Sequence, residues 1–97
     1  MKKSLTIQVE DRAKIEIADA YEWYEEQKPG LGETFFKAFE KTMDSIKKTP
    51  EGYEEIRYHR QIPIKKFPFV ILYERVDQVI YIDAVFHTSR DSEDKPK

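Results

Sequence analysis

Two breaks that contain proline and glycine most strongly limit how this 97-residue chain can fold. Proline lacks the amide hydrogen that a helix needs, and glycine accepts left-handed turns, so Pro29–Gly32 and Thr49–Gly52 each end a helix. Between residues 11 and 48 apolar residues recur every three or four positions, whereas beyond the second break they follow the two-residue period of strands. A chain of this length supports a single hydrophobic core, so we expect one domain over residues 1–97.

The helical period predicts two amphipathic helices joined as a hairpin. Asp11 is expected to cap the first, which runs for roughly 17 residues with acidic side chains on its outer face. The second is expected from Glu33 to Lys48, with its stripe rich in phenylalanine. The apolar residues are Ala13, Ile17, Ala20, Tyr21 and Tyr24 in the first helix and Phe35, Phe36, Phe39, Met43 and Ile46 in the second.

The rest of the chain predicts strands. Ser4–Val9 alternates apolar and polar residues, as a strand with one buried face does. Three antiparallel strands are expected at Tyr53–Arg60, Ile64–Val76 and Gln78–Phe86. Phe69–Tyr73 is apolar at every position, which predicts a central strand covered on both faces. The sequence therefore predicts an α+β domain of order β-α-α-β-β-β, in which a helical hairpin packs on a small twisted antiparallel sheet.

Composition and charge exclude several classes of function. The chain has no cysteine, and its two histidines make a poor zinc set, so we expect neither a metal nor a cofactor. A net charge of -2 does not favour a polyanionic partner for the molecule as a whole. The longest apolar run, Phe69–Tyr73, is far shorter than the roughly 20 residues of a membrane helix, which predicts a cytoplasmic protein without membrane contact. Asp91–Lys97 reads as a solvated tail.

One segment nevertheless concentrates positive charge. Residues 56–66 contain Arg57, Arg60, Lys65 and Lys66 and no acidic residue. On a strand-loop-strand element these side chains can bind phosphates or the carboxylates of a protein partner. An edge strand whose charges only face water and discourage aggregation explains the same pattern equally well.

Two further clusters carry side chains suited to chemistry or binding. His87 and Arg90 stand near the end of the last strand, and an imidazole beside a guanidinium suits RNA cleavage. The structural alternative is that His87 caps the sheet and Arg90 pairs with a nearby acid. On the first helix, Trp23 lies off the apolar stripe and with Tyr24 offers aromatic surface to a protein partner, although core packing explains Tyr24 more simply.

The chain as a whole resembles the RelE/ParE superfamily of bacterial type II toxin-antitoxin toxins, most closely the ParE-like plasmid-stabilisation branch. The resemblance covers most of the chain and rests on motifs in a fixed order: residues 18–27, Gly30-Leu31-Gly32 with Phe35 and Phe36, Pro50 and Tyr53, residues 67–73 and residues 84–91. It implies a growth-inhibiting protein that a cognate antitoxin wraps and silences in a hetero-oligomer. ParE-like relatives block DNA gyrase, whereas RelE-like relatives cut messenger RNA in the ribosome.

The branch that cuts RNA usually carries an arginine in the central strand, where this chain has Val70. An apolar side chain cannot stabilise a phosphorane, so we expect a toxin that binds DNA gyrase and cuts nothing. The alternatives are a ribosome-dependent endoribonuclease, with His87 and Arg90 as catalytic residues, and an inactive toxin kept for antitoxin binding. We expect the target to bind Arg57, Arg60, Lys65, Lys66 and Arg90, and the antitoxin to bind Trp23 and Tyr24.

Overall fold

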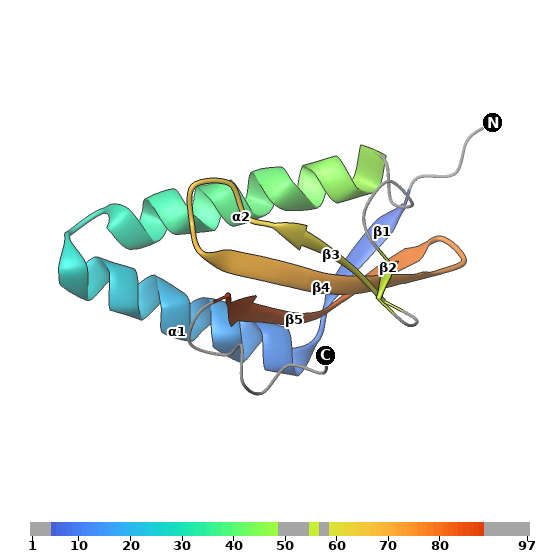
Figure 1. Cartoon of the computed structure of the whole chain (residues 1–97), viewed down its shortest axis with the longest axis horizontal. Helices are drawn as coiled ribbons and strands as arrows, with labels where there is room; N and C mark the ends of the chain where they lie inside the picture. Colours follow the sequence, from blue (N-terminus) through green and yellow to red (C-terminus); the bar gives the residue numbers. More distant parts are fainter. Residues whose placement is uncertain (1–4, 49–54, 57–58, 89–97) are drawn as a thin grey trace.

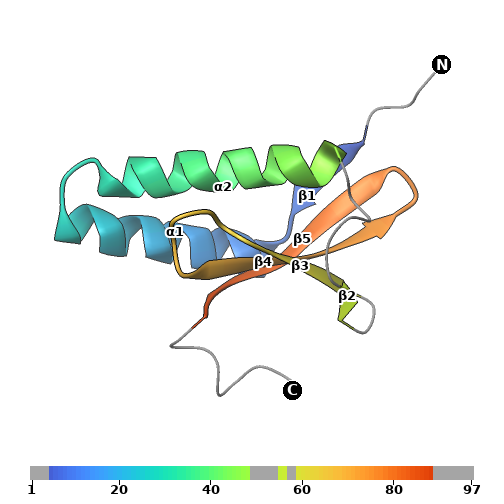
Figure 2. The same cartoon turned by 45° about the horizontal axis from the view of Figure 1, so that its top comes forward.

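The computed structural model describes residues 5–48, 55–56 and 59–88 of the chain. Its elements, in order, are β1 (Thr6–Val9), α1 (Asp11–Gln27), α2 (Leu31–Lys48), β2 (Glu55–Ile56), β3 (His59–Pro63), β4 (Phe69–Val76) and β5 (Val79–His87). The two helices lie side by side as a hairpin over one face of the sheet (Figure 1, Figure 2). The predicted α+β class and the helical hairpin are confirmed. Neither described helix combines the length and apolarity that crossing a membrane demands.

The sheet has the strand order β1-β5-β4-β3-β2, with β4 at its centre as expected. The pairs β2–β3, β3–β4 and β4–β5 are antiparallel. In contrast, β1 runs parallel to β5, with Ile7 opposite Ile80. The sheet is therefore mixed and not wholly antiparallel. Apolar alternation defines which face of a strand is buried, and it carries no information on the direction of the neighbouring strand.

The strand boundaries differ from the prediction by one or two residues in β1 and β5, and by more in two places. Tyr53–Arg60 is not one strand, because Ile56 of β2 lies opposite His59 of β3 in an antiparallel pair. β4 begins at Phe69 and not at Ile64, since residues 64–68 form a turn. In that turn the Ile64 N–H donates to the Phe69 carbonyl (2.8 Å) and Lys66 takes a positive φ of 73°. Residues 91–97, predicted as a tail, lie outside the described residues.

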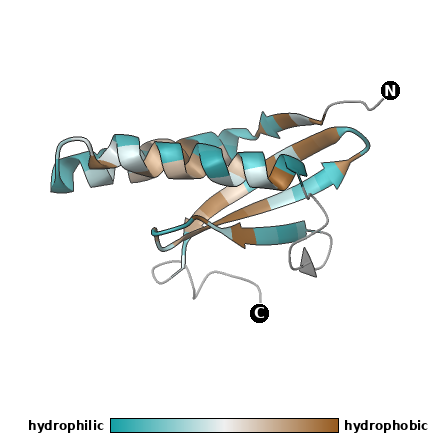
Figure 3. Ribbon diagram, turned by 90° about the horizontal axis from the view of Figure 1, so that it is seen from above, coloured by the Kyte–Doolittle hydropathy of each residue, from teal (hydrophilic) through white to brown (hydrophobic). Residues whose placement is uncertain are grey.

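The core lies between the helices and the sheet. The buried side chains of α1 and α2 match the predicted stripes with two kinds of exception: Tyr21, Phe36 and Met43 are half-buried at the margins, and Thr42, which was not predicted, is buried. Figure 3 shows hydrophobic residues along β4 and β5 and hydrophilic ones at the hairpin that joins them. On the opposite face of the sheet a smaller apolar cluster is formed by Val70, Leu72, Ala84 and Phe86. The prediction that β4 is apolar on both faces is therefore confirmed.

The connection between the helices is built around Glu25. Its Oε1 atom accepts hydrogen bonds from the backbone N–H groups of Gly30 (3.0 Å), Gly32 (2.9 Å) and Glu33 (3.4 Å). A carboxylate at this position also interacts favourably with the positive end of the α2 dipole. Gly32 is required here, because an added Cβ would lie 2.6 Å from the Tyr21 carbonyl oxygen.

Both helices begin at other residues than predicted. Asp11 is not the cap of α1; the N-cap residue is Glu10, and it makes no side-chain cap bond. The Glu10 N–H donates to the Ile82 carbonyl (2.9 Å), which extends the β1 ladder by one residue and leaves Asp11 in the first helical turn. α2 begins at Leu31, two residues before Glu33, because Glu25 satisfies the amides of its first turn.

Candidate functional site

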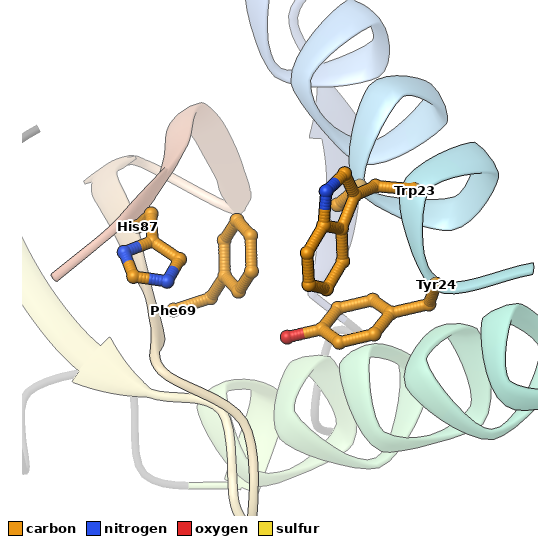
Figure 4. A pocket seen from close by; sticks show the side chains of 5 residues that line it. Trp23, Tyr24, Phe69 and His87 are labelled. Atoms are coloured by element: carbon orange, nitrogen blue, oxygen red, sulfur yellow. The ribbon is translucent and has the colours of Figure 1, made fainter. Parts of the chain in front are cut away.

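A small pocket opens where α1 passes the end of β5. It has a volume of about 80 Å³ and is lined by Ala20, Trp23, Tyr24, Phe69 and His87. Figure 4 shows the His87 imidazole and the Trp23 indole on opposite sides of the Phe69 ring. Two residues that the sequence marked for different reasons, Trp23 and His87, therefore border the same pocket.

The two aromatic residues proposed for antitoxin binding have different environments. Tyr24 is 8% exposed and belongs to the core, where its ring stacks on Phe35 at 5.4 Å and meets the edge of Phe67 at 5.1 Å. Trp23 is 46% exposed and packs edge-on against Tyr24 at 5.1 Å. Of the two, Trp23 therefore has its side chain open to solvent, while Tyr24 packs against the indole from within the core.

His87 lies at the end of β5 opposite Phe69 of β4. Its ring meets that of Phe69 edge-on, with centroids 5.2 Å apart. Phe69 belongs to the core under the helices, so His87 faces the helical side of the sheet. Arg90, its proposed catalytic partner, lies outside the described residues, as does Arg57.

Of the positive residues proposed for target binding, the three that the structure describes lie in two places. Lys65 and Lys66 lie in the turn between β3 and β4 and border an open groove of about 650 Å³. Lys37 and Lys41 from α2 line the same groove, which the sequence did not suggest because they are more than twenty residues away along the chain. Arg60 does not line this groove; it is half-buried on β3 opposite Tyr73.

On the sheet face away from the helices lies a cluster that the sequence analysis missed. His59 Nε2 is 2.9 Å from Asp83 Oδ2 and 3.4 Å from Glu74 Oε2. Partial burial raises the pKa of Asp83 from 3.8 to about 6, and the neighbouring Glu74 carboxylate adds to the rise while His59 opposes it. The three residues come from β3, β4 and β5, and only the strand register brings them together.

Comparison with known proteins supports the family resemblance described for the sequence. Residues 7–92 match the family model described as ParE toxin of type II toxin-antitoxin system, parDE. The chain belongs to the ParE toxin family. No curated protein sequence matches this ParE-family chain.

Two solved structures have a similar fold. One, titled "Chromosomal ParDE TA system from P. aeruginosa", has a TM-score of 0.76 at 12% identity, covering 87% of this chain and 96% of that chain. The other is a mutant of the E. coli toxin RelE in the free state, with a TM-score of 0.69 at 14% identity, covering 93% and 90%. At these identities the likeness concerns the fold, which is that of RelE/ParE toxins.

In this ParE-family toxin the central-strand position noted above, Val70, is 8% exposed. It packs with Ala84 and Phe86 on the face opposite to the helices. Val70 lies across from Phe86, and Phe69 lies across from His87, so Val70 and His87 are on different faces of the sheet.

Proposed function

We propose that this type II toxin inhibits growth by binding DNA gyrase, without cutting nucleic acid, and that a cognate antitoxin neutralises it in the cytoplasm. The observation that carries the choice of target is the position of Val70. Cleavage of RNA requires a cation close to the phosphate whose charge grows in the transition state. The side chain of Val70 lies in an apolar cluster and supplies none.

The position of His87 supports the same choice. A general acid or base must come within hydrogen-bond reach of the group it protonates. His87 packs on Phe69 on the helical side of the sheet, so it faces away from a phosphate bound over Val70. A ribosome-dependent endoribonuclease with His87 and Arg90 as its catalytic residues is the alternative.

For the target we propose a contact surface centred on the lysine groove. Lys65 and Lys66 are exposed on one side of it, and Lys37 and Lys41 line it from α2. Grouped charges of one sign steer a partner of opposite sign and fix its orientation. Arg57, Arg60 and Arg90 remain proposed contributors to target binding.

For the antitoxin we propose a contact at Trp23. Tryptophan is among the residues that contribute most to protein interfaces, above all beside a pocket that a partner can fill. The exposed indole of Trp23 borders such a pocket, and the buried ring of Tyr24 supports it. We propose that toxin and antitoxin assemble through this contact into a hetero-oligomer.

The test pairs a DNA supercoiling assay with gyrase and a toeprint of a translated message, both with purified toxin. The wild-type toxin is expected to inhibit supercoiling and to leave the message uncut. The double variant Lys65→Glu/Lys66→Glu should lose inhibition. Lys14→Glu/Lys28→Glu changes the charge equally at exposed sites outside the groove and should retain it.

Three other results of these assays would contradict the proposal, each in a different way. Ribosome-dependent cuts in the toeprint would establish the endoribonuclease, and their loss in His87→Ala would assign the catalytic residue. A toxin that binds its antitoxin but shows neither activity would be the inactive form. Equal loss in both double variants would remove the groove from the proposal.

A further inference from the structure

We propose that His59, Glu74 and Asp83 form a binding site for a divalent transition-metal ion, with zinc as the probe. The site lies on the sheet face away from the helices, and the inference does not depend on which target the toxin binds. The donor atoms of the three side chains all lie within 4.8 Å of one another.

The spacing of the donor atoms is close to that of a zinc site. Zinc bonds to imidazole nitrogen and carboxylate oxygen are about 2.0–2.2 Å long, which places tetrahedral ligand atoms about 3.3–3.6 Å apart. His59 Nε2 lies 2.9 Å from Asp83 Oδ2 and 3.4 Å from Glu74 Oε2. Two of the three separations between donor atoms are thus within about 0.4 Å of the tetrahedral spacing.

The contact between His59 and Asp83 is close without being a well-directed hydrogen bond. Asp83 Oδ2 is buried and has no hydrogen-bond partner, although the imidazole nitrogen is 2.9 Å away. The ring N–H axis is therefore not aimed at this oxygen. A buried carboxylate oxygen without a partner is costly and calls for an explanation, and a bound cation would satisfy it.

A β-bulge brings Asp83 into the cluster. Leu72 pairs with Ala84 and Tyr73 pairs with Ile82, so Asp83 is the extra residue on β5. Bulges redirect side chains and are common beside functional sites. Here the bulge places two carboxylates near each other, which is unfavourable unless a positive charge joins them.

The chemistry and the access of the site both suit a transition metal. One imidazole and two carboxylates are ligands for zinc or manganese, whereas magnesium and calcium prefer oxygen ligands alone. The side chains of His59, Glu74 and Asp83 are 34%, 35% and 22% exposed, so an ion can reach them from solvent. Three adjacent strands hold the ligands, which fixes their geometry better than loops would.

The test is isothermal titration of Zn²⁺ into the full chain after removal of metals with a chelator. We expect one zinc ion per chain and a loss of affinity of about tenfold or more in His59→Ala, since even changes next to metal ligands commonly cost that much. His87→Ala is the matched control, because His87 is the only other histidine, and it should bind zinc like the wild type.

A second variant tests whether a loss of zinc binding comes from misfolding. Asp83→Asn keeps the shape of the side chain, so circular dichroism should show a native fold. Zinc should raise the thermal midpoint of the wild type but not of Asp83→Asn. The proposal is overturned if the wild type binds no zinc, if His59→Ala and Asp83→Asn bind it unchanged, or if His87→Ala loses it. None of these results would bear on gyrase inhibition.

Discussion

The hydrogen bond from the Val85 N–H to Glu16 is the polar link between α1 and the sheet that we expect to matter most for stability. Glu16 Oε1 accepts this bond at 2.7 Å, and the two residues are 69 positions apart in the chain. The other carboxylate oxygen pairs with Arg12 at 3.2 Å, where the arginine side chain is 71% exposed. Replacing Glu16 by alanine removes both interactions and leaves the Val85 amide without its acceptor.

The expected cost follows from these two contacts. A hydrogen bond to a charged group contributes about 1.5–3 kcal/mol, and a solvent-exposed ion pair contributes at most about 1 kcal/mol. Alanine regains a few tenths of a kcal/mol, roughly, through its higher helix propensity. We therefore expect Glu16→Ala to lower the free energy of unfolding by about 2 kcal/mol. For a domain of this size that lowers the thermal midpoint by about 8–16 °C.

Thermal unfolding followed by circular dichroism measures this effect. Glu22→Ala removes a carboxylate from an exposed position of the same helix and should change the midpoint little. Arg12→Ala removes the ion pair alone and should cost less than half as much as Glu16→Ala. The reasoning is refuted if Glu16→Ala is as stable as Glu22→Ala, or if Arg12→Ala accounts for the whole loss.

Three further predictions concern a glycine, an exposed tryptophan and a partly buried carboxylate. Gly32→Ala should lower the free energy of unfolding by about 2 kcal/mol in a denaturant titration, because the new Cβ meets the Tyr21 carbonyl at 2.6 Å. Trp23→Ala should weaken antitoxin binding by titration calorimetry about 30-fold with little change in the thermal midpoint. The pKa of Asp83 is raised to about 6, so its ionised form opposes folding. In metal-free protein, Asp83→Asn should therefore have a higher free energy of unfolding than the wild type at pH 7.5. This difference should shrink as the pH falls from 6 to below 3.8, where Asp83 is protonated in both the folded and the unfolded chain.

The helical half of the fold was predictable because its signals are local. The apolar spacing in α1 and α2 and the break at Pro29–Gly32 give the hairpin, and most residues of the predicted stripes are buried. The exact start of each helix was not predictable. It depends on the hydrogen bond of the Glu10 N–H to the Ile82 carbonyl and on the hydrogen bonds that Glu25 accepts from the first amides of α2. Neither contact is part of the apolar spacing or of the capping pattern from which the helices were predicted.

The sheet was predictable in its faces and in the antiparallel pairing of β3, β4 and β5, but not in the pairing of β1 or in its register. The apolar run Phe69–Tyr73 correctly predicted that β4 is apolar on both faces, with Phe69 in the core and Val70 in the opposite cluster. The parallel pairing of β1 with β5 and the bulge at Asp83 depend on register, which one sequence does not encode locally. For that reason the sequence showed His59 as part of a basic segment, whereas the structure places it between two carboxylates.

The candidate sites divide between the two faces of β4, and this division bears on function. His87, the pocket beside Trp23 and the lysine groove involve the helices, so partners bound there contact a surface set by α1 and α2. The opposite face presents Val70 within an apolar cluster, next to the polar cluster of His59, Glu74 and Asp83. A nuclease would need its proton-transfer group and its phosphate-binding cation on one face. In the part of the chain that the structure describes, His87 and the central-strand position are separated by the sheet itself, and our proposal of inhibition by binding rests on that separation.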